Sequence, residues 1–406
     1  MLQEVVITGM GLISSLGLSL DENWENLVAG KSGVQKISLF DAGSCATRIA
    51  AELPGGFEDL SHTYIKKRAA GQMTRVTRMC VTAAKMAVAD SGIQFENLDR
   101  TRGSVIMGVV NTGNSSVEKE TTLQNTIFKS MTNSMPAWIS LEYHLLGPSF
   151  SVNTACASSA YAIAFGFEMI RNGQADIVIA GGADSIINAE EINGFNALYA
   201  LSVANDNPGC ASKPFSLDRD GFVIGEGAGV VILESKQHAL ARNSRIYATL
   251  AGVALTSEGY NIMAPMKDGD GMAATMELAL KNAGIQKDEV GYINAHGTST
   301  ELNDRYETMA IRKVFGDLAK TIPVSSTKSM TGHTIGAAGA IEAIITVLSL
   351  RAGILPPTIN YNLPDPDLDL DYIPNVARAK NCRVALSNSF GFGGHNATLV
   401  LKKYGS

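Results

Sequence analysis

The sequence predicts an α/β protein with largely parallel sheets. Short runs rich in β-branched residues recur along the chain and are apolar throughout, as expected of strands that are covered on both faces. These runs span residues 5–8, 104–110, 175–182, 229–234, 247–255, 290–297, 385–394 and 397–401. Helical patterns lie between them, at 74–91, 156–172, 271–284 and 336–352. Strands that alternate with helices indicate α/β layers.

Two parts of the chain resemble each other, which predicts an internal duplication. The segment TAAKMAVADSG (82–92) is similar to ATMELALKNAG (274–284), and both end at a glycine of the kind that caps a helix. A chain of 406 residues is also too long for one simple core. We therefore expect two packed halves, residues 1–248 and 249–406, with the seam near 245–255.

Composition and charge argue against several classes of protein. Hydrophobic residues make up 45% of the chain and charged residues 18%, which is typical of a globular protein. The formal net charge of −6 disfavours a nucleic-acid partner, because a phosphate backbone attracts an excess of Lys and Arg. The five cysteines are scattered, odd in number and without a CxxC pair, so neither a disulfide framework nor a structural zinc site is expected.

The N-terminus and the apolar segments favour a cytoplasmic protein. MLQEVVITGMG carries an early Glu4 and no basic region, so it lacks the pattern of a signal peptide. The apolar segments are interrupted by Gly, Ser or charge before the ~20 residues that a membrane span needs.

One cysteine, Cys156, stands between a polar pair and a stretch that is apolar on nearly every side. A free cysteine is most often a small buried hydrophobe, and this alternative stays open. If the helix starts at Cys156, however, unpaired backbone N–H groups and the helix dipole would stabilise a thiolate. A helix that is apolar all round must be enclosed by protein, so the thiol would face a tunnel rather than bulk water.

Two of the six histidines lie in loops of small residues that follow predicted strands. NAHGTSTELND contains His296, and SSTKSMTGHTIGAAGA contains His333 with Lys328 five residues before it. Small residues let backbone and ligand approach closely. Neither loop has HxxxH or HxH spacing, so catalysis is favoured over metal binding.

Three acids accompany these basic residues. Asp304 and Glu307 follow His296 on one face of a predicted helix, and Glu342 lies in the helix after His333. An enclosed Lys328 needs a carboxylate partner to stay charged, and either Glu342 or Glu307 would serve. An exposed helix face is the alternative for each acid taken alone.

The C-terminal segment SNSFGFGG (387–394) alternates phenylalanine with glycine. A flexible backbone that carries Phe390 and Phe392 would suit a gate, and its N–H groups would suit an oxyanion. An aromatic plug at a strand end is an equally good interpretation of the composition.

Taken together, TACASSA, NAHGTSTELND, SSTKSMTGHTIGAAG and SNSFGFGG, in that order, resemble the condensing enzymes of the thiolase superfamily. More narrowly, the chain resembles the elongating β-ketoacyl-acyl-carrier-protein synthases (type II) along its whole length, and it is close also to type II polyketide ketosynthases. The resemblance implies a thiolase-like fold with two duplicated halves in a five-layer α-β-α-β-α arrangement. The N-terminal half would carry the nucleophilic cysteine and the C-terminal half the two catalytic histidines.

The resemblance also implies a decarboxylative Claisen condensation with malonyl-acyl carrier protein. Cys156 would hold the acyl chain as a thioester, and His296 and His333 would stabilise the enolate. Lys328, paired with Glu342, would organise the two histidines. The further members of this supporting network would be Asp304 and Glu307.

Other implied roles concern the substrate carrier. The backbone N–H groups of Cys156 and Phe392 would form the oxyanion hole, and Phe392 with Phe390 would gate the acyl pocket. Thr298 and Thr300 would contact pantetheine. No metal or other cofactor is implied, because the substrates are carried on the phosphopantetheine of acyl carrier protein.

Two segments depart from the pattern of the family. GVVNTGNSS puts Asn111 where an apolar side chain commonly lines the acyl pocket, and the region 186–196, which contributes Phe195 to that pocket, is unusually polar. An unpaired Asn beside an alkyl chain would be costly. A polar, polyketone or polyene chain is therefore an alternative substrate. The protein would then be the catalytic half of a heterodimer with a chain-length factor, rather than a homodimer in fatty-acid synthesis.

The remaining expectations concern partners and rival classes. Lys66, Lys67 and Arg68 are candidates for docking the acidic carrier protein, with a solubilising run as the alternative. A degradative thiolase would need a second cysteine in the C-terminal glycine loop, which SFGFGG lacks. A non-catalytic chain-length factor would be expected to lack Cys156.

Overall fold

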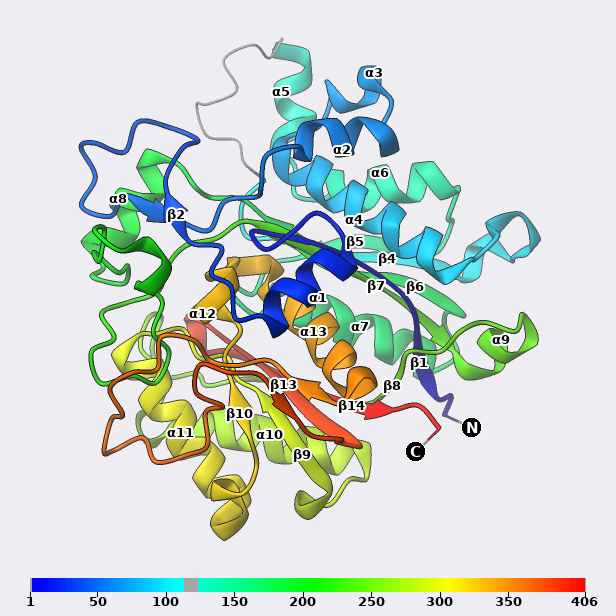
Figure 1. The fold of residues 1–406 in the computed structure, drawn as a ribbon. Coiled ribbons are helices and arrows are strands. Elements are labelled where there is room, and N and C mark those ends of the chain that lie inside the picture. Colours follow the sequence, from blue (N-terminus) through cyan, green and yellow to red (C-terminus); the bar gives the residue numbers. More distant parts are fainter. Residues whose placement is uncertain (1, 113–122, 406) are drawn as a thin grey trace.

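Ten strands form one continuous sheet in the computed structural model, which describes residues 2–112 and 123–405 (Figure 1). Their order divides into two sets of five where strand β8 meets strand β1. The first set runs, from this junction outwards, β1 (Val5–Ser14), β7 (Gly227–Ser235), β6 (Ile177–Asp184), β4 (Gly103–Gly108) and β5 (Ser149–Val152). The second set runs β8 (Ala248–Ser257), β14 (His395–Lys403), β13 (Val384–Gly391), β9 (Val290–Asn294) and β10 (Val324–Ser325).

The two sets of strands repeat the same pattern of directions. In each set, the first strand pairs antiparallel with the second, and the second pairs antiparallel with the third. The third, fourth and fifth strands pair in parallel. The sets are joined by a short antiparallel contact of β1 with β8. The predicted duplication is therefore confirmed. The expectation of largely parallel sheets was wrong, because the long central strands β1, β7, β8 and β14 are antiparallel and are still covered by helices on both faces.

Helices cover both outer faces and fill the space between the two sets of strands (Figure 1). Helices α4 (Arg75–Ser91) and α6 (Ser134–Tyr143) pack on the outer face of the first set. Helices α7 (Ser158–Arg171) and α13 (Ala338–Ala352) lie between the sets, and α10 (Asp270–Ala283) with α11 (Glu301–Phe315) covers the second. This is the five-layer α-β-α-β-α arrangement that the family resemblance implied.

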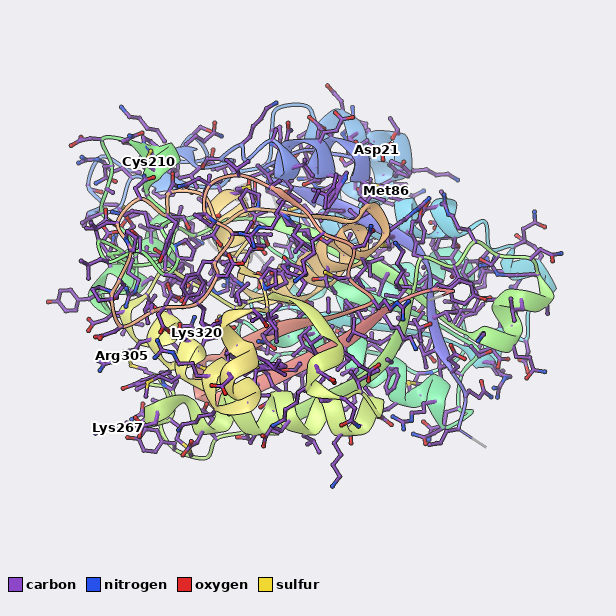
Figure 2. The ribbon with its side chains drawn as sticks, turned by 60° about the horizontal axis from the view of Figure 1, so that its bottom comes forward. Asp21, Met86, Cys210, Lys267, Arg305 and Lys320 are labelled. Atoms are coloured by element: carbon purple, nitrogen blue, oxygen red, sulfur yellow. The ribbon has the colours of Figure 1, made fainter. Side chains whose placement is uncertain are left out.

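The outer layer formed by α10 and α11 faces solvent. Arg305 of α11 and Lys267, just before α10, lie at the edge of the molecule in Figure 2, and both are exposed, as is Lys320 after α11. The central layer is largely apolar, because α7 and α13 contact strands of both sets. Within the described residues, one helical segment (335–352) is long and apolar enough to cross a membrane, and 89% of it is buried inside the protein. Its apolar character is explained by its place in the core.

The shorter elements complete the chain. The helices are α1 (Leu20–Val28), α2 (Phe57–Tyr64), α3 (Lys67–Ala70), α5 (Leu123–Ser130), α8 (Ala189–Ala197), α9 (Lys236–Ala241) and α12 (Lys328–Thr331). The strands are β2 (Gln35–Lys36), β3 (Ile49–Ala50), β11 (Ile354–Leu355) and β12 (Arg378–Ala379). The boundary between domains at residues 248 and 249 stays a prediction.

Candidate active site

Cys156 lies in the turn that leads from β5 into α7. The turn is tight, because Ala155 adopts a left-handed backbone (φ 51°) that a residue with a side chain rarely takes. The hydroxyl of Ser158 stabilises it by accepting from the N–H of Thr154 at 2.9 Å and donating to the carbonyl of Ala155 at 2.6 Å. Helix α7 begins at Ser158, so the expectation that the helix starts at the cysteine was wrong by two residues.

The resting thiol of Cys156 is neutral. Burial raises its pKa to about 12, although the charge of Lys328 and the backbone N–H groups of Phe392 and Cys156 act in the opposite direction. The sequence suggested a thiolate stabilised by the helix start. That expectation was wrong because the loss of water around the sulfur outweighs the nearby donors. The same two N–H groups nevertheless point at the sulfur, where the resemblance implied an oxyanion hole.

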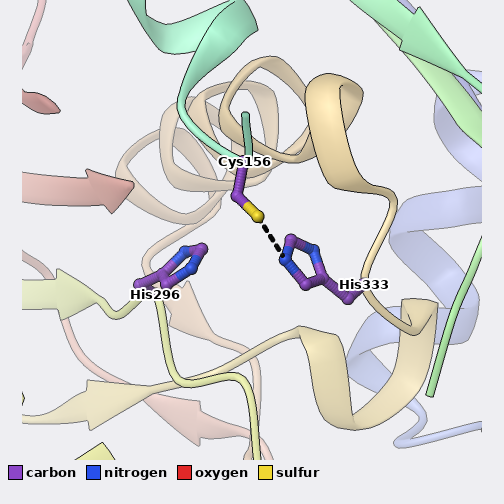
Figure 3. Close-up of side chains that lie close together, drawn as sticks. All are labelled: Cys156, His296 and His333. Carbon is purple, nitrogen blue, oxygen red and sulfur yellow. Dashed lines mark hydrogen bonds between the residues drawn. The ribbon is translucent and has the colours of Figure 1, made fainter. Parts of the chain in front are cut away.

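His296 and His333 face Cys156 from two loops (Figure 3). Nε2 of His333 lies 3.1 Å from the cysteine sulfur, and the two imidazole rings meet edge to face with their centres 5.4 Å apart. Both rings are buried. Burial, with the positive charge of Lys328, holds the pKa of each histidine well below its ordinary value. Both histidines are therefore neutral.

Hydrogen bonds fix which nitrogen of each neutral ring carries the proton. The N–H of Ile335 donates to Nδ1 of His333 at 3.2 Å, and the ammonium of Lys328, which can only donate, lies 3.3 Å from Nδ1 of His296. Nδ1 is thus an acceptor in both rings and Nε2 carries the hydrogen. Both histidines present an N–H donor to the space beside the sulfur.

Lys328 is held by a buried ion pair. Its ammonium contacts the carboxylate of Glu342 and also donates to the carbonyl of His296 at 2.7 Å. The sequence left Glu342 and Glu307 open as partners, and the structure selects Glu342. Burial raises the pKa of Glu342 to about 7 despite the opposing effect of Lys328.

Glu307 and Asp304 shape the loop of His296 through its backbone. The carboxylate of Glu307 accepts from the N–H groups of His296 and Gly297, each at 2.8 Å. Asp304 accepts from the N–H of Ser299 at 3.2 Å. Burial raises the pKa of both carboxyls, that of Glu307 to about 7. The alternative of an exposed helix face is wrong for both acids.

The glycine-rich loop after β13 approaches the cysteine closely. A Cβ on Gly391 would lie 2.8 Å from the carbonyl oxygen of Thr154 and 3.2 Å from the nitrogen of Cys156, so only glycine fits there. Phe390 is buried, with its ring 6.0 Å from that of His296, whereas 38% of Phe392 is exposed. Phe390 thus fits the aromatic plug, and Phe392 stands at the surface with its N–H directed at the sulfur.

Thr298 and Thr300 stand beside the loop of His296. Their hydroxyl oxygens are 2.9 Å apart, and Thr298 is buried. The structure thus brings both threonines to the edge of the site. Their contact with pantetheine stays a prediction.

The expectation from the sequence that Asn111 is an unpaired polar side chain was wrong. Its side-chain amide donates to the carboxylate of Glu191 at 2.8 Å, so the residue is not an unpaired polar group. Phe195 does not reach the histidines directly. It packs edge to face on Phe222 at 5.5 Å, and Phe222 packs on His333 at 5.2 Å. Whether Asn111 and Phe195 contact an acyl chain stays a prediction.

Lys66, Lys67 and Arg68 lie outside this constellation. They are exposed at the start of helix α3, which stands with α2 on the far side of the first set of strands from α10 and α11 (Figure 1).

Sequence reasoning missed several residues at the site. Asp184 is fully buried at the end of β6 and affects the charge of Cys156, and Phe222 packs on His333. Ser299 and Ile335 adopt left-handed backbones, as Ala155 does. A polar residue that ends a buried strand, as in ADIVIAGGAD, was the signal available for Asp184.

The sulfur and one ring nitrogen of each histidine lie within 4.8 Å of one another, a spacing that a metal ion could also use. The spacing of the histidines along the sequence could not reveal this, because the fold brings the three residues together from separate loops. The donor set does suit zinc, although a tetrahedral site would need a fourth ligand. The absence of a metal stays a prediction.

Comparisons with known proteins give a consistent result. The family described as "Beta-ketoacyl synthase, N-terminal domain" matches residues 2–239, and "Beta-ketoacyl synthase, C-terminal domain" matches residues 247–362. The chain is 40% identical to "3-oxoacyl-[acyl-carrier-protein] synthase 2" of Synechocystis sp. and 41% identical to the protein of that name from Coxiella burnetii. These matches cover 99% of this chain, and 98% and 99% of the two relatives.

Solved structures are similar over the whole chain. "The ishigamide ketosynthase/chain length factor" has a TM-score of 0.92 at 35% identity and covers both chains completely. A complex described as a type II PKS acyl-carrier protein with "its ketosynthase bound to the hexaketide" has a TM-score of 0.89 at 33% identity, covering 99% of this chain and 100% of the other.

The buried ion pair predicts that removing Lys328 has a cost that depends on pH. In Lys328→Met, Glu342 stays buried without its counter-ion, so we expect the free energy of unfolding at pH 8 to fall by about 3 kcal/mol. The folded-state pKa of Glu342 lies above its unfolded value, so its protonation stabilises the folded protein and the cost shrinks towards pH 6. Urea unfolding of both proteins at pH 6 and pH 8 measures this difference.

A matched exposed variant and a double variant serve as controls. Lys281→Met, on the exposed end of α10, should leave stability unchanged at both pH values. The double variant Lys328→Met/Glu342→Leu should regain most of the loss, because no buried charge is left. An equal cost at both pH values would contradict the ion-pair interpretation.

Proposed function

The chain belongs to the β-ketoacyl synthase family, and we propose that it joins an acyl chain held on Cys156 to malonyl-acyl carrier protein by decarboxylative Claisen condensation. The product is β-ketoacyl-acyl carrier protein, as in fatty-acid or polyketide chain elongation. The observation that carries this proposal is the meeting of one thiol and two neutral imidazole N–H donors in a single buried site.

In the first half of the reaction, Cys156 takes the acyl chain. Its sulfur attacks the thioester carbonyl of the incoming carrier, a new C–S bond forms, and the pantetheine sulfur leaves with the thiol proton. The carbonyl oxygen becomes negative in between. The N–H groups of Cys156 and Phe392 are directed at the sulfur, so they stand where donors stabilise that oxygen.

In the second half, the malonyl unit loses CO2. Nε2–H of His296 and of His333 donate to the malonyl thioester oxygen, which becomes the enolate oxygen as the C–C bond to the carboxylate breaks. The enolate carbon then attacks the acyl-cysteine carbonyl, a C–C bond forms, and the sulfur of Cys156 leaves as a thiolate that takes a proton from water. The charge of Lys328 close to Nδ1 of His296 strengthens the donor at Nε2.

The surrounding residues have supporting roles in this proposal. Phe392, with its exposed ring and its backbone donor, opens and closes the acyl pocket, and Phe390 holds the wall beside His296. Thr298 and Thr300 contact pantetheine, and Asn111 and Phe195 belong to the acyl pocket. No metal or other cofactor takes part, because the N–H donors and the loss of CO2 supply the chemistry.

We propose two kinds of partner. The first is acyl carrier protein, whose acidic surface would dock on Lys66, Lys67 and Arg68. The second is another chain of this fold, seated at the free edge of β5, where 65% of Leu141 and 69% of Leu146 are exposed. A cytoplasmic location fits curated relatives that are named for acyl-carrier-protein chemistry, and cell fractionation with a tagged chain tests it.

Two observations support polyketide synthesis as an alternative pathway. Two similar solved structures are described as polyketide or chain-length-factor assemblies, and the Asn111–Glu191 pair adds polar groups near the predicted acyl pocket. The chain would then be the catalytic subunit of a type II polyketide synthase with a chain-length factor as its partner. The curated relatives, at 40–41% identity, favour fatty-acid elongation over this alternative.

The proposed chemistry predicts that Cys156→Ala separates the two half-reactions. Without the thiol no acyl chain is held, so condensation should be abolished, whereas decarboxylation of malonyl-acyl carrier protein should survive because the two histidines remain. Product analysis by mass spectrometry with acyl- and malonyl-carrier protein measures both rates. Cys80→Ala, a buried cysteine of α4, is the control and should condense normally.

The same assay tests the absence of a metal. Wild-type protein should keep its rate with 1,10-phenanthroline present. Condensation by Cys156→Ala at the wild-type rate would contradict the proposed nucleophile. A rate that is lost with the chelator and restored by zinc would contradict the metal-free site.

The docking surface predicts a change in the Michaelis constant alone. Replacing Lys66, Lys67 and Arg68 with Glu should raise the Michaelis constant for carrier protein at least tenfold, because the acidic partner is repelled. Acylation of Cys156 by a small thioester should be unchanged. Lys267→Glu/Lys281→Glu/Lys287→Glu, at three exposed lysines of the outer α10 layer, reverses the same number of charges and is the matched control. An unchanged Michaelis constant would refute this surface.

The assignment of the pathway predicts the behaviour of the chain purified alone. A fatty-acid enzyme should have the mass of two chains by light scattering and should elongate octanoyl- and dodecanoyl-carrier protein. Leu146→Glu should separate the two chains, whereas Leu240→Glu, at an exposed leucine of α9, should not. Little activity until a chain-length-factor subunit is added would instead support the polyketide alternative.

A further inference from the structure

Asp184 is a buried carboxylate that the proposed reaction does not use. It is the last residue of β6 and has no exposed surface. One of its oxygens accepts from the N–H groups of Val110 and Gly336, each at 3.0 Å. The other accepts from the N–H of Asn111 at 3.4 Å, and the N–H of Ser185 also bonds to this carboxylate. Backbone N–H groups from three separate stretches of chain thus donate to Asp184, while burial raises the pKa of its carboxyl to about 7.

One of these stretches leads directly to a catalytic histidine. Gly336 follows Ile335, which is held in a left-handed backbone (φ 47°) that is strained for a β-branched residue. That conformation turns the N–H of Ile335 towards Nδ1 of His333, at 3.2 Å. This hydrogen bond keeps the proton of His333 on Nε2, next to the sulfur of Cys156.

The contact between Asp184 and Gly336 leaves no free space. A Cβ on Gly336 would lie 2.6 Å from the carboxylate oxygen and 3.0 Å from the nitrogen of Val110. The backbone at Gly336 is therefore pressed against both the end of β6 and the segment that follows β4. The carboxylate connects the wall that contains Asn111 with the turn that orients His333.

We propose that Asp184 is a positioning residue which, through the N–H of Gly336, holds the strained turn at Ile335 and so fixes His333 as a hydrogen-bond donor beside Cys156. Asp184 touches neither the thiol nor the ring of His333 in this arrangement. The inference rests on the proposed function for its kinetic consequence, but the arrangement of the turn can be measured without activity.

Because Asp184 carries a charge, an effect on the position of His333 can be distinguished from general damage to the fold. Its charge raises the pKa of the Cys156 thiol, so a neutral replacement should leave the thiol as reactive as before or more so. Loss of the turn should weaken enolate stabilisation by His333. A positioning role therefore predicts opposite effects on two measurements, whereas unfolding would lower both.

The test compares Asp184→Asn with wild-type protein. The amide has one acceptor oxygen and an NH2 group that faces N–H donors, so it cannot satisfy all four. We expect decarboxylation of malonyl-acyl carrier protein to fall by about 100-fold, the order of loss from a misplaced catalytic group. Alkylation of Cys156 by iodoacetamide at pH 8 should proceed at the wild-type rate or faster.

Two further variants make the comparison sharper. Gly336→Ala breaks the same contact from the other side and should give the same pair of effects. The double variant should be no slower than the slower single variant, because both remove one interaction. Glu234→Gln is the matched control: Glu234 is also fully buried, but at the opposite end of the β6–β7 pair, and should keep wild-type decarboxylation.

A structural readout keeps the inference distinct from the proposed function. Nitrogen-15 NMR of labelled histidine should report a protonated Nε2 on His333 in wild-type protein and a mixture of tautomers in Asp184→Asn. Wild-type protein that neither decarboxylates nor condenses would count against the proposed function alone. An unchanged His333 spectrum, wild-type decarboxylation by Asp184→Asn, or additive effects in the double variant would each overturn the role of Asp184.

Discussion

The site depends on one buried ion pair, that of Lys328 with Glu342. Two charges removed from water are costly unless they meet each other and further hydrogen-bonding groups, and here the ammonium also contacts the carbonyl and Nδ1 of His296. Burial holds the pKa of both histidines low, and the positive charge of Lys328 further disfavours their protonation. Because the rings stay neutral with Nδ1 as acceptor, each offers a single N–H to the same point. A cationic imidazole would offer a different chemistry, so burial and the charge of Lys328 together determine what the histidines can do.

The duplicated fold explains how the two halves supply one site. Helices α7 and α13 occupy the middle layer, and they touch closely because Gly339 has no side chain: a Cβ there would lie 2.7 Å from that of Ala160. The N–H of Ala340 donates to the hydroxyl of Ser159 at 2.9 Å across the same contact. Cys156 precedes one of these helices and His333 precedes the other. Packing of the middle layer therefore sets the distance between the sulfur and the imidazole.

Much of this could be predicted from the sequence, and the failures have physical causes. The eight apolar runs became the eight long strands, because burial on both faces leaves a clear pattern. The edge strands β5 and β10 were missed, because they are short and half polar. The ordered motifs around Cys156, His296 and His333 identified residues that do meet. The pKa of Cys156 and the partners of Asn111 could not be predicted, since both depend on groups distant in sequence.

The strained turns of the site follow a common rule. Ala155, Ser299 and Ile335 each adopt a left-handed backbone, at a cost of roughly 1–2 kcal/mol apiece, and each lies within three residues of a predicted catalytic group. A buried side-chain oxygen bonds the backbone of each turn: that of Ser158 at Ala155, that of Asp304 at Ser299, and that of Asp184 next to Ile335. Such strain persists only where the surroundings over-determine the conformation. Asp304 and Asp184 therefore serve the backbone of the site, and residue types alone could not show this, because the N–H groups that they accept from belong to segments distant in sequence or to turns formed only in the fold.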